Sequence, residues 1–187
     1  EANPTPAGRI DFQAARGLGV TRLSVGAQSA HQADLRLFNR GHDWDDVVLT
    51  VKETRRAGFE NVNLDLIYGA PGQTLASWRC TLRRALELAP EHLSLYALSV
   101  EPDTAMDAWL ERGELNRPDP DLAADMYEYA SEVLPQAGLQ QYEISNWARP
   151  GYACQHNLQY WRYQPYLGFG AGAHGFVDAL RYEVVRS

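Results

Sequence analysis

Short segments in which apolar and polar residues alternate recur along the first half of the chain, and each precedes a segment with helical periodicity. The segment "TRLSVGAQS" (21–29) precedes "AHQADLRLFNR" (30–40), and "NVNLDLIYGAPGQT" (61–74) precedes "LASWRCTLRRALELAP" (75–90). Alternation with a period of two predicts a strand, whereas apolar residues three or four positions apart predict a helix. Strands that alternate with helices at this spacing predict βαβ units and a parallel sheet.

Two further segments continue the same rhythm. "DWDDVVLTVKETRRAGF" (43–59) predicts an amphipathic helix, with Asp43 as its N-cap and Gly58 just beyond its end. "HLSLYALSV" (92–100) predicts the next strand, so the strand–helix repeat extends to about residue 100.

The pattern changes after residue 100. Residues 119–139 predict a long helix, with Pro120 near its start and Gly138 near its end. A short strand and a glycine-rich segment follow it. We therefore predict one domain over residues 1–100 and a smaller α+β region over residues 101–187.

Side chains of opposite character fall on the two faces of each predicted strand. In "NVNLDLI", Val62, Leu64 and Leu66 share one face, and Asn63 and Asp65 share the other. "HLSLYAL" and "TRLSVGAQS" alternate in the same way. A strand in a helix-covered sheet is apolar on the side that meets the helices, so the polar side is predicted to face a cavity.

This row of polar groups also determines the predicted fold class. The interior of a filled barrel consists mainly of Val, Ile and Leu, and three polar strands do not fit it. We predict an α/β fold with an open or partial (β/α) TIM-like barrel that holds a ligand. Ligands of such folds bind at the carboxyl ends of the strands, where Gln28, Asp65 and Tyr96 lie.

The charge and cysteine content exclude several classes of protein. The 187 residues have a formal net charge of -7, which argues against a nucleic-acid-binding protein, because such proteins neutralise phosphates with basic groups. No apolar run reaches the ~20 residues of a membrane span, and we expect no signal peptide. Only two cysteines, Cys80 and Cys154, are present and they are far apart, which favours a reducing cytoplasm.

Several residues could carry chemistry, and the pattern alone leaves their roles open. Arg40 either clamps a carboxylate or is a solvated residue at a helix end, whereas an inward Asp65 requires a partner. The spacing of Cys154 and His156 does not give the four ligands of a closed metal site. His156 is then either a hydrogen-bonding group on a loop or a single axial ligand of a haem.

The glycine-rich "GFGAGAH" (168–174) invites comparison with a dinucleotide-binding loop. No suitable helix or acidic residue follows it, so a Rossmann fingerprint is not predicted. A tight turn packed on a cofactor or on the barrel rim fits the sequence better.

Six segments in order make the chain recognisable. They are "GVTRLSVGAQS", "NRGHDWDDV", "AGFENVNLDLIYGAPGQT", "EHLSLYALSVEPDT", "QYEISNWARPGYACQHNLQYW" and "YLGFGAGAHG". Together they resemble the family of oxygen-independent coproporphyrinogen III oxidase-like proteins, which are radical S-adenosylmethionine (SAM) proteins. The resemblance covers essentially the whole chain, and it implies a partial barrel whose C-terminal part is residues 1–100.

The family contains true oxidases, which decarboxylate coproporphyrinogen III, and haem chaperones, called HemW. "SLYALSVEPDT", "YEISNWARPG" and "HNLQYW" look like the chaperone branch, in which a His-Asn-x-x-Tyr-Trp motif is associated with haem binding. The resemblance places this motif at His156, Asn157, Tyr160 and Trp161, with His156 as the candidate iron ligand. It implies a cytoplasmic protein that delivers haem to acceptor proteins.

The resemblance also implies a SAM site. Glu1 matches the acidic residue that ends the preceding strand, and Gln28 matches a glutamine near the ribose. Arg40 matches the arginine that meets the methionine carboxylate, and Asp65 matches a further residue of the pocket. Gln28 and Asp65 are also residues that the strand pattern marks as polar and inward, and Arg40 is the residue that could clamp a carboxylate.

The chain departs from the family in one respect. The Cys-x-x-x-Cys-x-x-Cys loop that holds a [4Fe-4S] cluster is not found in it, and we expect these cysteines upstream of Glu1. The chain then resembles a fragment that begins near the third barrel strand. Whether SAM is cleaved or only bound stays open. A porphyrinogen oxidase, and a barrel enzyme without radical chemistry, remain alternatives to the chaperone.

Overall fold

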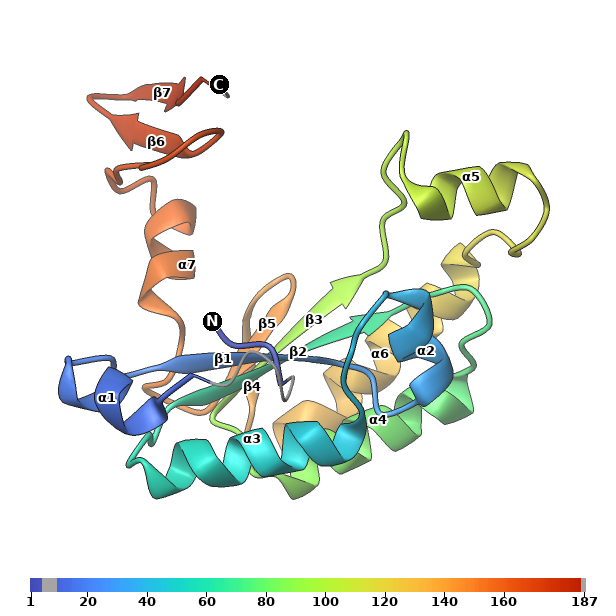
Figure 1. Cartoon of the computed structure of the whole chain (residues 1–187), viewed down its shortest axis with the longest axis horizontal. Helices are drawn as coiled ribbons and strands as arrows, with labels where there is room; N and C mark the ends of the chain where they lie inside the picture. The colour runs from blue at the N-terminus through green and yellow to red at the C-terminus, as the bar shows by residue number, and fades with distance from the viewer. Residues whose placement is uncertain (5–9, 186–187) are drawn as a thin grey trace. The chain divides into compact units, whose positions relative to one another are not determined.

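The structure is a computed structural model that describes residues 1–4 and 10–185 (Figure 1). The chain divides into two compact units, Glu1–Tyr152 and Ala153–Ser187, which are described separately below. The predicted boundary at residue 100 marks the end of the strand–helix repeat, and it stays a prediction about domain organisation.

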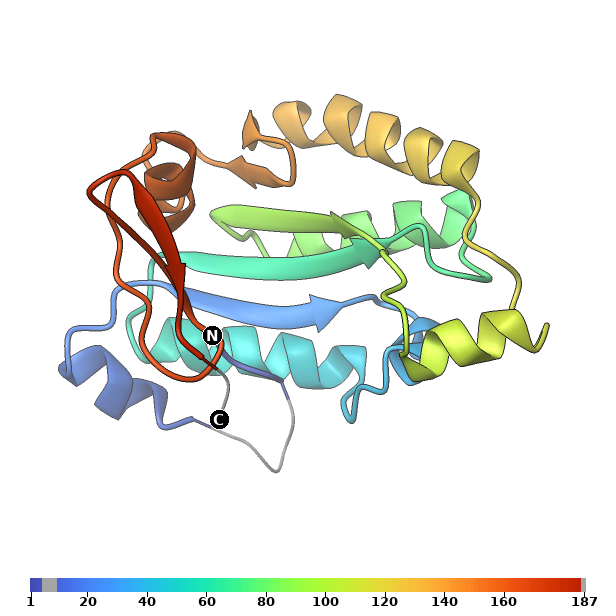
Figure 2. The ribbon, with the colours of Figure 1, turned by 90° about the horizontal axis from the view of Figure 1, so that it is seen from above.

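A mixed five-stranded sheet forms the centre of the first unit. Its strands are β1 (Leu23–Gln28), β2 (Val62–Tyr68), β3 (His92–Ala97), β4 (Gln140–Glu143) and β5 (Asn146–Ala148), in the spatial order β1-β2-β3-β5-β4. The first three strands are parallel, as the repeat predicts, and they run side by side in Figure 2. Strands β5 and β4 extend the sheet in antiparallel fashion.

The first residues of the chain pair with the outer edge of β1. Ala2 forms a parallel bridge with Val25, because its amide donates to Ser24 and its carbonyl accepts from Gly26. This pairing agrees with the expectation that the first residues are the end of a strand. The opening segment "EANPTPAG" (1–8) also predicts a turn after this strand end, and that turn falls on residues 5–9, outside the described residues.

Helices α3 (Trp44–Arg56), α4 (Leu75–Glu87) and α6 (Pro120–Gln136) pack on one face of the sheet (Figure 1). The apolar side chains that the alternation assigns to this face are buried against them, among them Val25, Leu64 and Leu93. Smaller helices occupy the connections: α1 (Phe12–Gly17), α2 (Gln32–Leu37) and α5 (Ala105–Glu111).

The ends of the helices follow the local signals in the sequence. The carboxylate of Asp43 accepts from the backbone of Asp46, whose own side chain accepts from the amide of Asp43, so α3 begins with a capping box. Gly58 follows the helix with a φ of 86°, a conformation in which glycine has no Cβ strain. Pro120 opens α6, and Gly138 follows its end with a φ of 82°.

The second unit consists of helix α7 (Gln155–Trp161) and a hairpin of β6 (His174–Val177) and β7 (Leu180–Glu183). Two of the hypotheses from sequence are settled here. His156 lies on a short helix rather than on a loop, because residues 155–161 form about two turns of helix after Cys154. The glycine-rich segment leads into strand β6 and not into a helix, which agrees with the rejection of a Rossmann loop.

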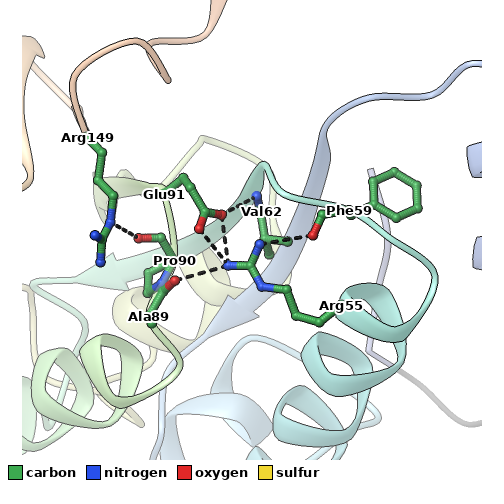
Figure 3. A network of polar contacts seen from close by, with 7 residues as sticks. All are labelled: Arg55, Phe59, Val62, Ala89, Pro90, Glu91 and Arg149. Atoms are coloured by element: carbon green, nitrogen blue, oxygen red, sulfur yellow. Dashed lines mark hydrogen bonds and ion pairs between the residues drawn. The ribbon is translucent and has the colours of Figure 1, made fainter.

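A polar network joins the amino-terminal ends of β2 and β3 to helix α3 (Figure 3). The Arg55 guanidinium lies 2.8 Å from the Glu91 carboxylate, and it also donates to the carbonyls of Phe59 and Ala89. Glu91 Oε2, the oxygen of that 2.8 Å contact, also accepts from the Val62 amide at 2.9 Å, and Oε1 accepts from Arg55 at 2.9 Å. Since the Glu91 side chain is only 15% exposed, this ion pair is better shielded from water than a surface pair.

We expect Arg55→Ala to lower the free energy of unfolding by about 2 kcal/mol, because it leaves a largely buried carboxylate and two carbonyls without their charged donor. Urea denaturation of the purified chain measures this loss. Arg83→Ala is the matched control, since Arg83 and Glu87 are a solvent-exposed pair on α4 at 4.0 Å and should contribute about 0.5 kcal/mol or less. Equal losses in the two variants would contradict the role given to Arg55.

Candidate functional site

The face of the sheet opposite the three long helices carries hydrogen-bonded polar side chains. Both oxygens of the half-buried Asp65 carboxylate are engaged: Ser24 Oγ donates to Oδ2 at 2.8 Å and Asn63 Nδ2 donates to Oδ1 at 2.8 Å. These residues come from neighbouring parallel strands, which alternation places on the same face. The expectation that an inward Asp65 needs a partner is therefore confirmed.

A buried histidine extends this row across β3. His92 Nδ1 lies 2.6 Å from Asn63 Oδ1, and His92 Nε2 lies 2.7 Å from the Tyr142 hydroxyl. Because a carboxamide oxygen only accepts, Nδ1 carries the hydrogen and Nε2 accepts from the tyrosine. Burial, with a smaller contribution from the charge of Arg22, lowers the pKa of His92 to about 3.

A second polar group gathers above Gly26. Arg40 Nη1 donates to Asn3 Oδ1 at 3.1 Å, and Gln28 is buried with its backbone in the left-handed region, at a φ of 63°. A Cβ at position 26 would lie 3.0 Å from Gln28 Nε2 and 3.3 Å from Asn3 Oδ1. The glycine in the middle of β1 thus leaves room for these two amide side chains, which a larger residue would crowd.

The two polar groups lie on adjoining strands. Gln28 is paired in register with Leu66, the residue after Asp65. Burial raises the pKa of Tyr96, a hydrogen bond with Ser94 opposes this, and the negative charges of Asp65, Glu143 and Glu1 raise the pKa further. Arg40 is therefore bonded to Asn3, and Gln28 and Asn3 both lie next to Gly26, whereas the convergence of Gln28, Arg40 and Asp65 on one common ligand stays a prediction.

Sequence reasoning missed several members of this polar face. Neither Asn3, which accepts from Arg40, nor His92 is among the residues that the sequence pattern marks. A signal for His92 was available, because it occupies the same strand face as Ser94 and Tyr96. Tyr142 carried no such signal, since strand β4 reaches the sheet only through β5.

The second unit contains a cleft of about 720 Å³, which we call the aromatic cleft. It is lined by Tyr160, Trp161, Tyr163, Gln164, Tyr166, His174, Phe176 and Arg181. Two of the four residues of the predicted haem motif, Tyr160 and Trp161, are in this lining. The Tyr160 and Tyr166 rings meet edge to face with centroids 4.5 Å apart.

The other two motif residues lie on the same helix. His156 is exposed, and its Nε2 lies 2.8 Å from the Tyr160 hydroxyl, with the two ring centroids 4.7 Å apart. Asn157 is half-buried and makes a polar contact of its own. The spacing of four residues in α7 thus joins the candidate ligand His156 to a wall of the aromatic cleft.

Residues 1–4 and 10–185 contain no group of three or more His, Cys, Asp or Glu side chains placed to hold a metal ion. Within the same residues, no helix is both long and apolar enough to cross a membrane. The cysteines of an iron–sulfur cluster, expected upstream of Glu1, stay a prediction.

Comparison with known proteins shows which families the chain is similar to. Residues 2–85 match the Radical SAM superfamily. The chain is 41% identical to the heme chaperone HemW of Synechocystis sp. over 97% of its own length, and 40% identical to HemW of Bacillus subtilis over 97%. It is 44% identical over 94% of its length to mouse radical S-adenosyl methionine domain-containing protein 1, mitochondrial.

The fold is also similar to that of a radical SAM enzyme. The structure superposes on the coproporphyrinogen III oxidase HemN of Escherichia coli, described as a radical SAM enzyme, with a TM-score of 0.75 and 27% identity over 93% of this chain. The chain spans less than half the length of these relatives: 44% and 48% of the two bacterial chaperones, 40% of the mouse protein and 43% of HemN. The predicted family resemblance and the partial-barrel α/β fold are confirmed.

The buried His92 should make stability depend on pH. The unfolded chain binds the His92 proton near pH 6.5, whereas the folded chain does so only near pH 3, so unfolding takes up a proton between these values. We expect this group to lower the free energy of unfolding by up to about 1.4 kcal/mol for each unit that the pH falls through this window. Denaturation at a series of pH values measures the slope.

His92→Gln provides the comparison. The variant should be less stable at pH 7, because it loses the bonds to Asn63 and Tyr142, and it should show a shallower decrease of stability below pH 6.5. A slope that equals that of the unchanged protein would contradict the assignment of a neutral, buried imidazole.

Proposed function

We propose that this chain belongs to a radical SAM haem chaperone, which binds haem and passes it to acceptor proteins. The observation that carries the proposal is the similarity to HemW proteins over 97% of the chain, at 40% and 41% identity. The aromatic cleft beside that motif supports it. A cytoplasmic location and the identity of the acceptors belong to the same proposal.

The SAM site of the proposal consists of Glu1, Gln28, Arg40 and Asp65. Their chemistry fits the cofactor: a guanidinium suits the methionine carboxylate, and carboxylate and amide groups suit the ammonium and the ribose hydroxyls. When bound beside a reduced [4Fe-4S] cluster, SAM supplies radical chemistry. This chain contributes the binding groups, held in place by Ser24, Asn63 and Asn3.

The haem site of the proposal consists of His156, Asn157, Tyr160 and Trp161. An imidazole is a common axial ligand of haem iron, and aromatic rings offer stacking surface to a flat macrocycle. The exposure of Trp161, which is 53%, is high for a tryptophan, and it fits a ring that is covered only when a ligand is present.

An oxygen-independent coproporphyrinogen III oxidase is the second candidate, which the superposition on HemN favours. Conversion of coproporphyrinogen III to protoporphyrinogen IX by the full-length protein, with its cluster and SAM, would establish this activity. Stable haem binding without such conversion supports the chaperone.

We expect the purified protein to bind ferric haem with a shifted Soret band, and His156→Ala to weaken binding about tenfold or more through the loss of an iron ligand. Absorbance titration measures both. His31→Ala is the control, because it removes an imidazole from the first unit, where it contacts the Ser77 carbonyl, and it should leave the titration unchanged. Absence of any Soret shift in the unchanged protein would overturn the proposed function.

For SAM, we expect Arg40→Ala to raise the Kd about tenfold or more, since a charge-assisted bond to a carboxylate contributes roughly 1.5–3 kcal/mol. Equilibrium dialysis with labelled SAM measures the Kd. Arg36→Ala removes the same charge from the exposed end of α2 and should have little effect. If the two variants bind SAM equally well, Arg40 is not part of the site.

A further inference from the structure

We propose that the porphyrin of this protein occupies the aromatic cleft, with His174 as a ligand of its iron and Arg181 paired with a propionate. This inference rests on the proposed haem binding and extends it to two residues outside the His-Asn-x-x-Tyr-Trp motif. Both residues belong to the hairpin β6–β7, and both line the cleft.

The pairing of the hairpin explains why these side chains meet. Phe176 and Arg181 are cross-strand partners, and His174 precedes Phe176 by two residues on β6. Side chains two apart on a strand, and those directly paired across strands, lie on the same face. One face of the hairpin therefore presents an imidazole, a phenyl ring and a guanidinium together, and this is the face that lines the cleft.

Two glycines allow this arrangement. A Cβ at position 175 would lie 2.1 Å from the Tyr182 ring, and one at position 168 would lie 2.1 Å from the His174 carbonyl oxygen. The Gly168 amide donates to the Tyr182 hydroxyl at 3.0 Å. The glycine-rich segment thus lies close against the hairpin and fixes the backbone of His174. This packing explains the glycines of "GFGAGAHG" without a bound dinucleotide.

The cleft has the chemistry of an iron porphyrin site. Its lining is mostly aromatic, its volume of about 720 Å³ falls within the roughly 300–1,000 Å³ of small-molecule pockets, and its charged side chain is one arginine. A ligand that fits is flat and apolar, has a carboxylate at its edge and offers a metal to an imidazole. Haem meets each condition, whereas an apolar ligand without charge would leave Arg181 unused.

The two histidines of the second unit differ in whether their imidazole nitrogens are already hydrogen-bonded. His156 Nε2 is hydrogen-bonded to the Tyr160 hydroxyl, whereas the imidazole of His174 has no hydrogen-bond partner among the residues that the structure describes. His174 is therefore ready to ligate without the loss of an existing contact. With His156 as the motif ligand, His174 provides a second imidazole, and two imidazole ligands make ferric haem six-coordinate and low-spin.

The test combines two variants with three ligands in the purified protein. With ferric haem, we expect His174→Ala to raise the Kd about tenfold and to change the absorption and electron paramagnetic resonance spectra from low-spin to high-spin. Arg181→Gln should raise the Kd about tenfold and leave the spin state unchanged. Metal-free protoporphyrin IX, followed by its fluorescence, should respond to Arg181→Gln but not to His174→Ala.

The dimethyl ester of haem removes the propionate charges, so Arg181→Gln should lose its effect on that ligand while His174→Ala keeps its effect. Far-UV circular dichroism checks that both variants remain folded. If His174→Ala leaves affinity and spin state unchanged while His156→Ala still weakens binding, this inference is overturned and the proposed haem binding stands. If the unchanged protein binds no haem, the proposed function itself fails.

Discussion

Burial of one face of the sheet against helices α3, α4 and α6 is the interaction on which the rest of the first unit depends. Leucines and valines at alternate positions, such as Val25, Leu64 and Leu93, are removed from water there, and each such burial contributes roughly 1.5–3 kcal/mol. Because the period of a strand is two, the same registration directs Ser24, Asp65 and Ser94 to the opposite face. The apolar core and the polar candidate site are therefore fixed by one pattern.

The polar face stays folded because its groups satisfy one another. Asp65 accepts from two side chains, and His92 is held between Asn63 and Tyr142. An unpaired polar group at such depth would cost about 1–3 kcal/mol, so the network rigidifies the surface that carries the proposed SAM residues. Asn146 Oδ1, which is buried without a partner in the described residues, remains an acceptor that a bound ligand or water can satisfy.

The second unit is small and, unlike the first, is not built around a large apolar core. It buries few apolar side chains and leaves Trp161, Tyr163 and Phe169 exposed, by 53%, 82% and 84%. Close backbone contact at Gly168 and Gly175, rather than a large core, shapes the aromatic cleft. A bound porphyrin would cover much of this apolar surface, so ligand binding and stability should be linked in this unit.

The alternation of residues indicated the parallel strands and the polar character of one sheet face. Local signals indicated the N-cap at Asp43 and the start of the long helix at Pro120, because these too are local consequences of side-chain type. The family resemblance supplied the candidate residues for SAM and haem. Only the tertiary structure joined Asn3 to Arg40 and His92 to Tyr142, since these pairs are separated by 37 and 50 positions and no local pattern encodes their contact. It likewise placed His174 in the aromatic cleft, because that depends on how a hairpin and a glycine turn pack together.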